Sequence, residues 1–593
     1  MQTNLKLKKY KNMNRIYSKL KTVAILTSII AISSSCSNKN GYYHAEIYAV
    51  NDIHGALFDS LYVDGKTNKT SLANVSAYIN SRRAEIGADK VAMLDLGDAL
   101  QGDNSVFYAN YVDTSNSAKH LFSRIVEYIG HDALIVGNHD IETGHNVYDK
   151  ITAEISVPYL AANAIDKNSG KCYFQPYAIV NKGGIEIAII GMTNPNIKKW
   201  LGEEQWHGID FLPIEEIAQT LVDEVKKKHN PDFTILAIHA GLGDGSGEDI
   251  ENPARYLASS LKGIDAVLAS HDHQTDCEKI WNGKDSVLVI EGGSRCKNLL
   301  KIDIEANYEN GRQVAKTLKG ELVPMEGLAV DNQYLAAFRE DFLKTKAFTN
   351  QEIGTLNEEI NTVDAFFGPS SYLNLVHSVQ LANSGADVSM AAPLTYNGKV
   401  EAGKLIYHDL FTIYPFENQL YVISLTGKQI LDCLEYSYDT WISTMSSSKE
   451  HLLRINYNEK HGRYDFVYPA FNFDSAAGVI YDVDVREPFG SRVKIKSMAD
   501  GTQFDLAKNY KVAMSSYRAN GGGDLLTKGA SIPKEELSSI ILEKKDDIRG
   551  MIYKFYRSGN TVDKMIEAQW KFIPEPMVKE AIQRDRALVF GKK

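Results

Sequence analysis

Short runs of consecutive apolar residues alternate with stretches of helical spacing over the first half of the chain. Continuous apolar runs of this length are typical of strands that are buried on both faces. We expect such strands at residues 46–50, 91–96, 133–136, 185–190, 233–238, 266–269 and 287–290. Apolar residues at helical spacing predict helices between them, for example over residues 71–85 and 214–228. The pattern therefore predicts an α/β sandwich built in layers.

The strand pattern stops near residue 330, and the chain of 593 residues is long enough for more than one domain. We expect a first domain over residues 36–330, a linker helix over residues 331–350 and an α+β domain over residues 351–593. Charged and apolar residues at helical spacing also predict an amphipathic helix over residues 535–554.

The first 35 residues have the pattern of a secretory signal peptide. A lysine-rich head without acidic residues precedes a short apolar run and a series of small residues, which end at Cys36. The run is too short for a membrane span, which needs about 20 residues. This segment resembles the bacterial lipoprotein box, and the resemblance implies cleavage before Cys36 and acylation of its thiol. We expect an exported protein of the periplasm or outer membrane, which touches the membrane only through this anchor. The alternative is a plain signal peptide.

Charge restricts the range of partners. The chain has 65 Lys and Arg residues against 75 Asp and Glu residues, a formal net charge of -10. Bulk attraction to a phosphate backbone is therefore absent, and we expect no nucleic-acid polymer as a partner. Any phosphate chemistry must then depend on local positive charge, such as metal ions.

Residues able to bind metal follow five of the predicted strands directly. Because ligands bind beyond the carboxyl ends of strands in open α/β sheets, these residues should meet at one edge. The segments are Asn51-Asp52-Ile53-His54, Gly97-Asp98, Gly137-Asn138-His139-Asp140, His239-Ala240-Gly241 and His271-Asp272-His273.

The donor types indicate the chemistry. Asp, His and Asn provide oxygen and imidazole nitrogen without thiolate, which suits Zn, Mn, Fe or Co. Two divalent ions facing only Asp52, Asp98 and one hydroxide would leave about one positive charge for an anionic substrate. Paired ions also activate a water and stabilise the oxygens of phosphoryl transfer. The pattern therefore predicts a phosphoester hydrolase.

The order D-x-H, G-D-x-x-Q-G, G-N-H-D, H-A-G and H-x-H resembles the calcineurin-like metallophosphoesterases, and Asn51 with Gln101-Gly102 is similar to their nucleotidase branch. The resemblance implies a four-layer α/β/β/α sandwich and two divalent metal ions. It implies that one ion is bound by Asp52, His54, Asp98 and His273. The second is bound by Asp98, Asn138, His239 and His271, with Asp98 bridging.

His139 corresponds to the catalytic histidine of this family, which contacts the phosphoryl group or the leaving oxygen. In the family's 5'-nucleotidases an Asp three positions later orients that histidine; here the position holds Glu142, which is one methylene longer. A lone carboxylate after a strand usually caps a helix. We therefore interpret Asp140 and Asp272 as structural residues. For Glu142, both a structural role and a role in orienting His139 stay open.

The second domain contains two segments whose aromatic residues and glycines could bind a nucleobase. Aromatic faces can stack on a nucleobase, and glycines let the backbone approach a ligand closely. The segments around residues 469–474 and 516–524 resemble those of the 2',3'-cyclic-nucleotide 2'-phosphodiesterase/3'-nucleotidases, and the family stacks the base between two aromatics. The resemblance implies the substrate-binding residues Phe471, Tyr517, Arg518, Asn520, Gly521, Gly522 and Gly523. Residues 391–394 lack the Arg that 5'-nucleotidases carry there.

Together these observations predict an exported two-metal nucleotide phosphoesterase, expected to be a monomer. It would hydrolyse 2',3'-cyclic nucleotides, nucleoside monophosphates or both by attack of a metal-bridging hydroxide. One alternative is an enzyme like the 5'-nucleotidases and UDP-sugar hydrolases. An alternative of another class is an inactive lipoprotein that captures nucleotides or metal.

Overall fold

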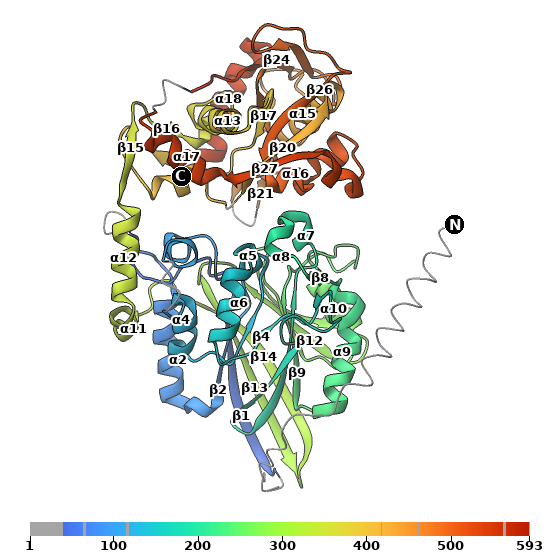
Figure 1. The fold of residues 1–593 in the computed structure, drawn as a ribbon. Coiled ribbons are helices and arrows are strands. Elements are labelled where there is room, and N and C mark those ends of the chain that lie inside the picture. The colour runs from blue at the N-terminus through green and yellow to red at the C-terminus, as the bar shows by residue number, and fades with distance from the viewer. Residues whose placement is uncertain are drawn as a thin grey trace.

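The computed structural model describes residues 39–62, 67–113, 118–416, 418–459, 462–560 and 565–591. The chain folds into two lobes, an N-terminal lobe drawn from blue to yellow-green and a C-terminal lobe drawn from yellow to red (Figure 1). The signal-peptide and Cys36 predictions lie outside the described residues. Among the residues described, no helix combines the length and apolar character needed to cross a membrane.

The N-terminal lobe contains two six-stranded sheets, in each of which four neighbouring strands run parallel and the other two pair antiparallel. The first has the order β14-β13-β1-β2-β3-β4, in which β1 to β4 run parallel. The second has the order β11-β12-β10-β9-β7-β6, in which β12, β10, β9 and β7 run parallel. The strands of the first sheet are β1 (Gly41–Val50), β2 (Val91–Asp95), β3 (Ala133–Ile135), β4 (Tyr159–Leu160), β13 (Asn298–Glu309) and β14 (Arg312–Pro324). Those of the second are β6 (Tyr177–Lys182), β7 (Ile185–Thr193), β9 (Phe233–His239), β10 (Ala266–Leu268), β11 (Thr275–Trp281) and β12 (Ser286–Gly292).

Alternate residues of these strands enter different hydrophobic cores. On β1, Ile47 and Ala49 point into the core between the two sheets, whereas Tyr48 points into a core shared with helices. The helices on that side are α2 (Leu72–Ile86), α4 (Leu121–Ile129) and α6 (His145–Glu154). The outer face of the second sheet packs on α9 (Ile214–His229) and α10 (Ala254–Ser260). The lobe is therefore the four-layer α/β/β/α sandwich that was expected.

All seven predicted strand segments lie in strands, β1, β2, β3, β7, β9, β10 and β12, and both example helices form as α2 and α9. The central strands are parallel within each sheet, so their carboxyl ends lie at one edge. The polar segments that follow them are thus brought to the same end of the lobe.

The C-terminal lobe contains a five-stranded sheet of order β23-β17-β26-β20-β27 and a three-stranded sheet of order β25-β24-β28. Helix α15 (Gly427–Trp441) packs on one side of the larger sheet, and α13 (Ser371–Ser384) with α17 (Ile548–Arg557) packs on the other. The lobe is an α+β domain. The strands of these two sheets are β17 (Val388–Ala391), β20 (Gln419–Thr426), β23 (Ser475–Ala477), β24 (Val479–Asp484), β25 (Val493–Met498), β26 (Asn509–Ser515), β27 (Ile541–Asp547) and β28 (Gln569–Ile573).

The prediction of one helix over residues 535–554 is wrong. A 3-10 turn (Lys534–Ile540) is followed by the strand β27, and only α17 is α-helical. Partly buried and exposed side chains alternate along β27, which pairs with β20 at the sheet edge. The charged residues of this segment fit an exposed edge strand, so tertiary pairing outweighs the local helical spacing.

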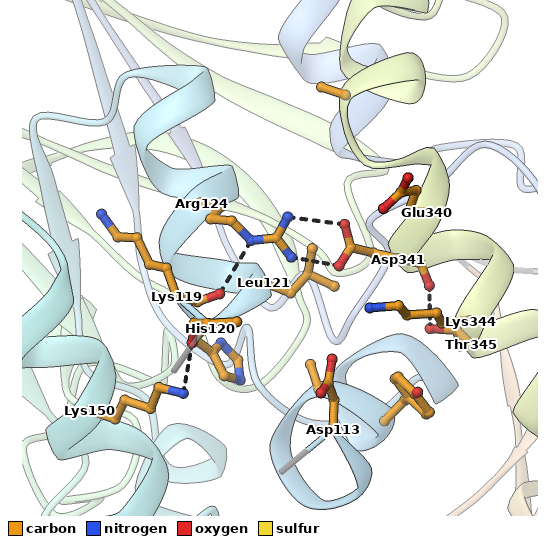
Figure 2. Close-up of a pocket in the computed structure, with 14 residues that line it drawn as sticks. Asp113, Lys119, His120, Leu121, Arg124, Lys150, Glu340, Asp341, Lys344 and Thr345 are labelled. Carbon is orange, nitrogen blue, oxygen red and sulfur yellow. Dashed lines mark hydrogen bonds and ion pairs between the residues drawn. The ribbon is translucent and has the colours of Figure 1, made fainter. Parts of the chain in front are cut away.

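Two short helices, α11 (Asn332–Ala337) and α12 (Arg339–Thr349), connect the lobes. Arg124 of α4 binds Asp341 of α12 through two hydrogen bonds, Nη1–Oδ2 at 3.1 Å and Nη2–Oδ1 at 2.5 Å (Figure 2). The pair lies beside a cavity of about 310 Å³ between α4 and α12. The bidentate geometry attaches α12 to the N-terminal lobe.

Candidate metal centre and active site

The seven predicted metal ligands lie at or just beyond the carboxyl ends of β1, β2, β3, β9 and β10 and come together in space. Their donor atoms form two groups, one of Asp52, His54 and His273 and one of Asp98, His239 and His271. Within each group all the donor atoms lie within 4.8 Å of one another. The seventh residue, Asn138, begins α5 (Asn138–Glu142) and joins the second group.

Short distances connect the first group. His54 Nε2 lies 3.0 Å from His273 Nε2, and the latter lies 3.6 Å from Asp52 Oδ1. Asp52 is fully buried and accepts hydrogen bonds from the side chain of Asn51 and from the backbone N–H of His271. Two imidazole nitrogens and one carboxylate oxygen thus face a common point.

The second group is equally compact. His239 Nε2 lies 3.1 Å from both Asp98 Oδ2 and Asn138 Oδ1, and His271 Nδ1 lies 2.9 Å from Asn138 Oδ1. The other nitrogen of His239, Nδ1, lies 2.8 Å from the carbonyl of Leu96, which fixes the ring. Nitrogen and oxygen donors again converge.

The backbone of the site is strained. Asp52, His54, Asp98, His271 and His273 all have positive φ angles, at 47°, 43°, 58°, 91° and 58°. This region is unfavourable for residues with a side chain, and such strain concentrates at functional sites. The loops are therefore held in shapes that aim these five side chains inward.

Electrostatics favour a cation here. Burial alone would raise the pKa of Asp98, but His239 and His139 hold it well below its usual range. Burial lowers the pKa of His54 to about 3, so its ring is neutral and has a free lone pair. Burial would also lower the pKa of His239, yet Asp98 raises it to about 10. A site that attracts positive charge and offers N and O donors fits divalent metal ions.

His139 lies on α5 beside both groups. Its Nδ1 contacts Glu142 Oε2 one helical turn later, and its backbone N–H donates to Asp98 Oδ1 at 2.8 Å. Glu142 is buried, whereas the side chain of His139 is 24% exposed. Burial would lower the pKa of His139, yet Asp98 and Glu142 raise it to about 9. The longer Glu side chain therefore reaches the imidazole.

Asp140 has the structural surroundings that its position after a strand suggests. Its carboxylate accepts backbone hydrogen bonds from Gly137, Asp98, Ala99 and Leu100. Asp272 likewise accepts the backbone N–H groups of Leu242 and Gln274. These contacts tie the ligand loops together.

A third group of candidate ligands, His44, Glu46 and Asp303, lies on β1 and β13. Glu46 already accepts two hydrogen bonds from Arg82 and one from Tyr48, and Lys301 lies 3.2 Å from Asp303. These basic partners explain the cluster without a metal.

The predicted nucleotide-binding residues lie in the C-terminal lobe. The rings of Phe471 and Tyr517 have centroids 6.2 Å apart and stand at 78°, edge to face. Tyr517 is on α16 (Ser516–Ala519), which contacts α7 (Ile197–Trp200) of the N-terminal lobe. The two rings are neighbours, but they are not parallel as a base between them would require.

The guanidinium of Arg518 forms hydrogen bonds with neighbouring residues of the same lobe. It donates to Asp474, to the side chain and backbone carbonyl of Asn472, and to the carbonyl of Gly522. This network braces the segment beside Phe471, and the Arg518 side chain is buried.

The glycines beside Tyr517 are required by close packing. A Cβ atom on Gly522 would lie 2.4 Å from the Tyr517 ring, and one on Gly523 would lie 2.1 Å from Arg518 Nη1. Gly521 has a φ of 99°, which a side chain would disfavour, and Asn520 ends α16.

Two family models match the chain. The model of the calcineurin-like phosphoesterases matches residues 45–275, and that of the 5'-nucleotidase C-terminal domain matches residues 352–528. The chain is a calcineurin-like metallophosphoesterase with a 5'-nucleotidase C-terminal domain. It is therefore a metal-dependent phosphoester hydrolase.

Curated relatives of this metallophosphoesterase cover most of its length. A 2',3'-cyclic-nucleotide 2'-phosphodiesterase/3'-nucleotidase of Yersinia enterocolitica is 24% identical over 566 residues, 84% of each chain. A 5'-nucleotidase of Vibrio parahaemolyticus is 25% identical over 528 residues, 79% of this chain and 90% of the relative. The metallophosphoesterase thus belongs among nucleotide phosphoesterases.

Solved structures show the same fold. A Staphylococcus aureus structure has a TM-score of 0.73 at 20% identity and covers 89% of this chain and 99% of its own. The 5'-nucleotidase precursor of Thermus thermophilus has a TM-score of 0.60 at 20% identity, covering 90% and 100%.

Sequence reasoning assigned no role in the metal centre to three residues beside it. Trp200 stacks on the ring of His271, with centroids 5.3 Å apart, and Glu251 contacts the same ring. Asn196 in turn donates to Glu251.

Proposed function

We propose that this metallophosphoesterase is an exported two-metal enzyme that hydrolyses 2',3'-cyclic nucleotides, nucleoside monophosphates or both. The observation that carries the proposal is the convergence of seven donors, six of them buried or half-buried, from the ends of five strands into two groups. A structural role would not require so many nitrogen and oxygen donors to face one another at one end of the lobe.

Asp52, His54 and His273 would hold one ion, and Asn138, His239 and His271 would hold the other. Asp98 would serve both, because its carboxylate lies 3.1 Å from His239 of the second group and also attracts the imidazole of His54 in the first group. When bound, two divalent ions lower the pKa of water and stabilise the negative charge of phosphoryl transfer. Zn, Mn, Co and Fe all suit these donors.

His139 would donate a hydrogen bond or a proton to the phosphoryl group or the leaving oxygen, since its Nε2 is the ring nitrogen not engaged by Glu142. Glu142 would hold the imidazole by accepting the Nδ1 hydrogen. Asp98 supports the same residue through the backbone N–H of His139. Both contacts support a protonated ring, which would lie beside the phosphate.

The C-terminal lobe would bind the nucleobase against Tyr517. Phe471 is 40% exposed, so its ring can turn from the edge-to-face arrangement and let a base stack. Asn520 and the three glycines would then line the nucleotide, and Arg518 would support Asn472 instead of touching the substrate. We propose the division into residues 36–330, 331–350 and 351–593 for these roles.

A direct comparison of substrates tests the proposal. Purified protein loaded with Mn²⁺ or Co²⁺ would be assayed with 2',3'-cyclic AMP, 3'-AMP and 5'-AMP under identical conditions. We expect the first two to be hydrolysed with the higher kcat/KM. Preference for 5'-AMP would instead establish the 5'-nucleotidase alternative, which the Vibrio relative represents. Hydrolysis of none of them with any divalent metal would favour the capture protein.

Export and lipid attachment at Cys36 need a separate experiment. We expect a mature N-terminus at Cys36 and a mass increase from acylation when the full-length chain is expressed in a bacterium with an outer membrane. Cys36→Ser would release the protein from the membrane fraction. An unmodified, freely released parent would support the plain signal peptide.

A further inference from the structure

Three neighbouring strands bring one unassigned acidic residue to the metal centre. In the second sheet β10, β9 and β7 are adjacent, so the loops after their carboxyl ends lie side by side. The loop after β10 carries His271, the loop after β9 carries Glu251, and the segment after β7 carries Asn196 and Trp200. All four side chains meet.

The two nitrogens of the His271 ring contact different residues, on opposite sides of the ring. Nδ1 lies 2.9 Å from Asn138 Oδ1 inside the second ligand group, and Nε2 lies 3.3 Å from Glu251 Oε1 outside it. A carboxylate can only accept a hydrogen bond, so Glu251 selects the tautomer with hydrogen on Nε2. That tautomer leaves the Nδ1 lone pair free for a metal.

We propose that Glu251 is a positioning residue that fixes the tautomer and orientation of His271 for the second metal. This inference rests on the metal assignment proposed above. Carboxylate partners of ligating histidines orient the ring and increase its basicity. The distance places Glu251 in this role for the present chain.

Glu251 is itself held in place. Asn196 Nδ2 donates to Glu251 Oε2 at 3.2 Å, so one carboxylate oxygen faces His271 and the other faces Asn196. Asn194 Nδ2 donates to the backbone carbonyl of Glu251 at 3.0 Å, and Asn194 Oδ1 accepts the N–H of Asn196 at 3.0 Å. Both asparagines are buried. Because Asn196 holds the side chain of Glu251 and Asn194 holds its backbone, Glu251 loses little additional conformational entropy when it orients the His271 ring.

Trp200 restrains the same ring from its face. The indole and imidazole planes are 23° apart with centroids at 5.3 Å, an offset stacked arrangement. Stacking restricts the tilt of the imidazole, while the contact with Glu251 restricts rotation in its plane. The two contacts together leave one orientation, in which Nδ1 faces Asn138.

A metal titration tests this role without reference to catalysis. Metal-stripped full-length protein would be titrated with Co²⁺ and followed by visible absorption and by calorimetry, for the parent, Glu251→Ala and Glu251→Gln. We expect Glu251→Ala to weaken one of two Co²⁺ sites by roughly 10- to 100-fold and to leave the other unchanged. Glu251→Gln should restore most of the affinity, because its amide oxygen can still accept from Nε2.

Glu248→Ala is the matched control, since Glu248 is an exposed acid on the same loop and should leave both sites unchanged. If Glu251→Ala does not fold, Asn196→Ala, which frees Glu251 Oε2, should weaken the same site by a smaller factor. Unchanged binding in Glu251→Ala would overturn the inference. So would equal losses in Glu251→Ala and Glu251→Gln.

The titration also separates this inference from the proposed function. A parent that binds two Co²⁺ ions but hydrolyses no nucleotide would contradict the function and leave the role of Glu251 standing. A parent that hydrolyses nucleotides while Glu251→Ala retains both affinities would contradict only the role of Glu251. A parent that binds fewer than two Co²⁺ ions would contradict both.

Discussion

His139 and Glu142 lie one turn apart on α5, and the Nδ1 atom of the histidine contacts the buried carboxylate. The extra methylene of Glu, compared with the Asp of the related 5'-nucleotidases, does not prevent this contact. The pair has the geometry of a histidine oriented by an acid.

Removing either member of this pair should reduce turnover. We expect His139→Ala to lower kcat by roughly 10²- to 10⁴-fold, the usual contribution of a positioned acid or base. Glu142→Ala should lower kcat by about tenfold, since the imidazole remains but is no longer held. Steady-state kinetics with the preferred nucleotide would measure both. An unchanged kcat in His139→Ala would show that the residue is not catalytic.

Removal of metal should abolish activity and lower stability. Ions that bind only the folded protein stabilise it by about 2.7 kcal/mol at a concentration 100 times the dissociation constant. We expect the melting temperature to fall after chelation and to recover with Mn²⁺ or Co²⁺. Asp98→Asn should lose this response, because Asp98 belongs to the second ligand group and is the residue proposed to serve both ions. Asp303→Asn is the control, because Lys301 and Arg82 already neutralise the cluster of His44, Glu46 and Asp303. Its melting temperature should change on chelation as that of the parent does.

Gly522→Ala should weaken nucleotide binding selectively. The added methyl group would lie 2.4 Å from the Tyr517 ring, so the ring must move. Loss of base stacking, worth about 1–3 kcal/mol, should raise KM for nucleotides by about tenfold. Hydrolysis of bis(p-nitrophenyl) phosphate, which has no nucleobase, should not change. Equal losses on both substrates would place Gly522 in the phosphate site or in the fold instead.

Stability should fall in mild acid because of His377. This histidine of α13 is fully buried, with Nδ1 at 2.9 Å from Ser389 Oγ, and burial lowers its pKa to about 3. Below pH 6.5 the unfolded chain binds a proton that the folded chain does not, so the free energy of unfolding decreases as pH falls toward 3. The loss from this one group should be about 2 kcal/mol at pH 5.

His377→Gln provides the comparison, because glutamine does not titrate in this range. Urea unfolding at pH 7.5, 6 and 5 would show a shallower pH dependence for the variant than for the parent. An identical dependence would mean that other groups determine the acid sensitivity of the lobe.

Much of the N-terminal lobe could be predicted because its signals are local. Buried parallel strands such as β2 and β9 are continuous apolar runs, and a polar ligand segment directly follows each of them. Parallel pairing then places Asp98 at the carboxyl-end edge of the first sheet and His239 at that of the second. The strand order within the sheets required the structure, since β13 returns to pair with β1 from more than 250 residues away.

The sequence was less informative where long-range contacts override local pattern. Residues 541–547 have helical spacing, but pairing with β20 makes them an edge strand. The resemblance implied that Arg518 binds substrate, and the structure adds that its guanidinium donates to Asn472, Asp474 and Gly522. Neither outcome follows from nearby residues.

By itself, the sequence determined the layered α/β fold and the types of metal donor. Buried strands are continuous apolar runs, and the donor residues follow these runs directly in the sequence. Only the tertiary structure decided how these donors divide into two groups and which acid faces His271. Those relationships join loops after different strands, and their distances depend on sheet order, strained backbone angles and side-chain packing that no local pattern encodes.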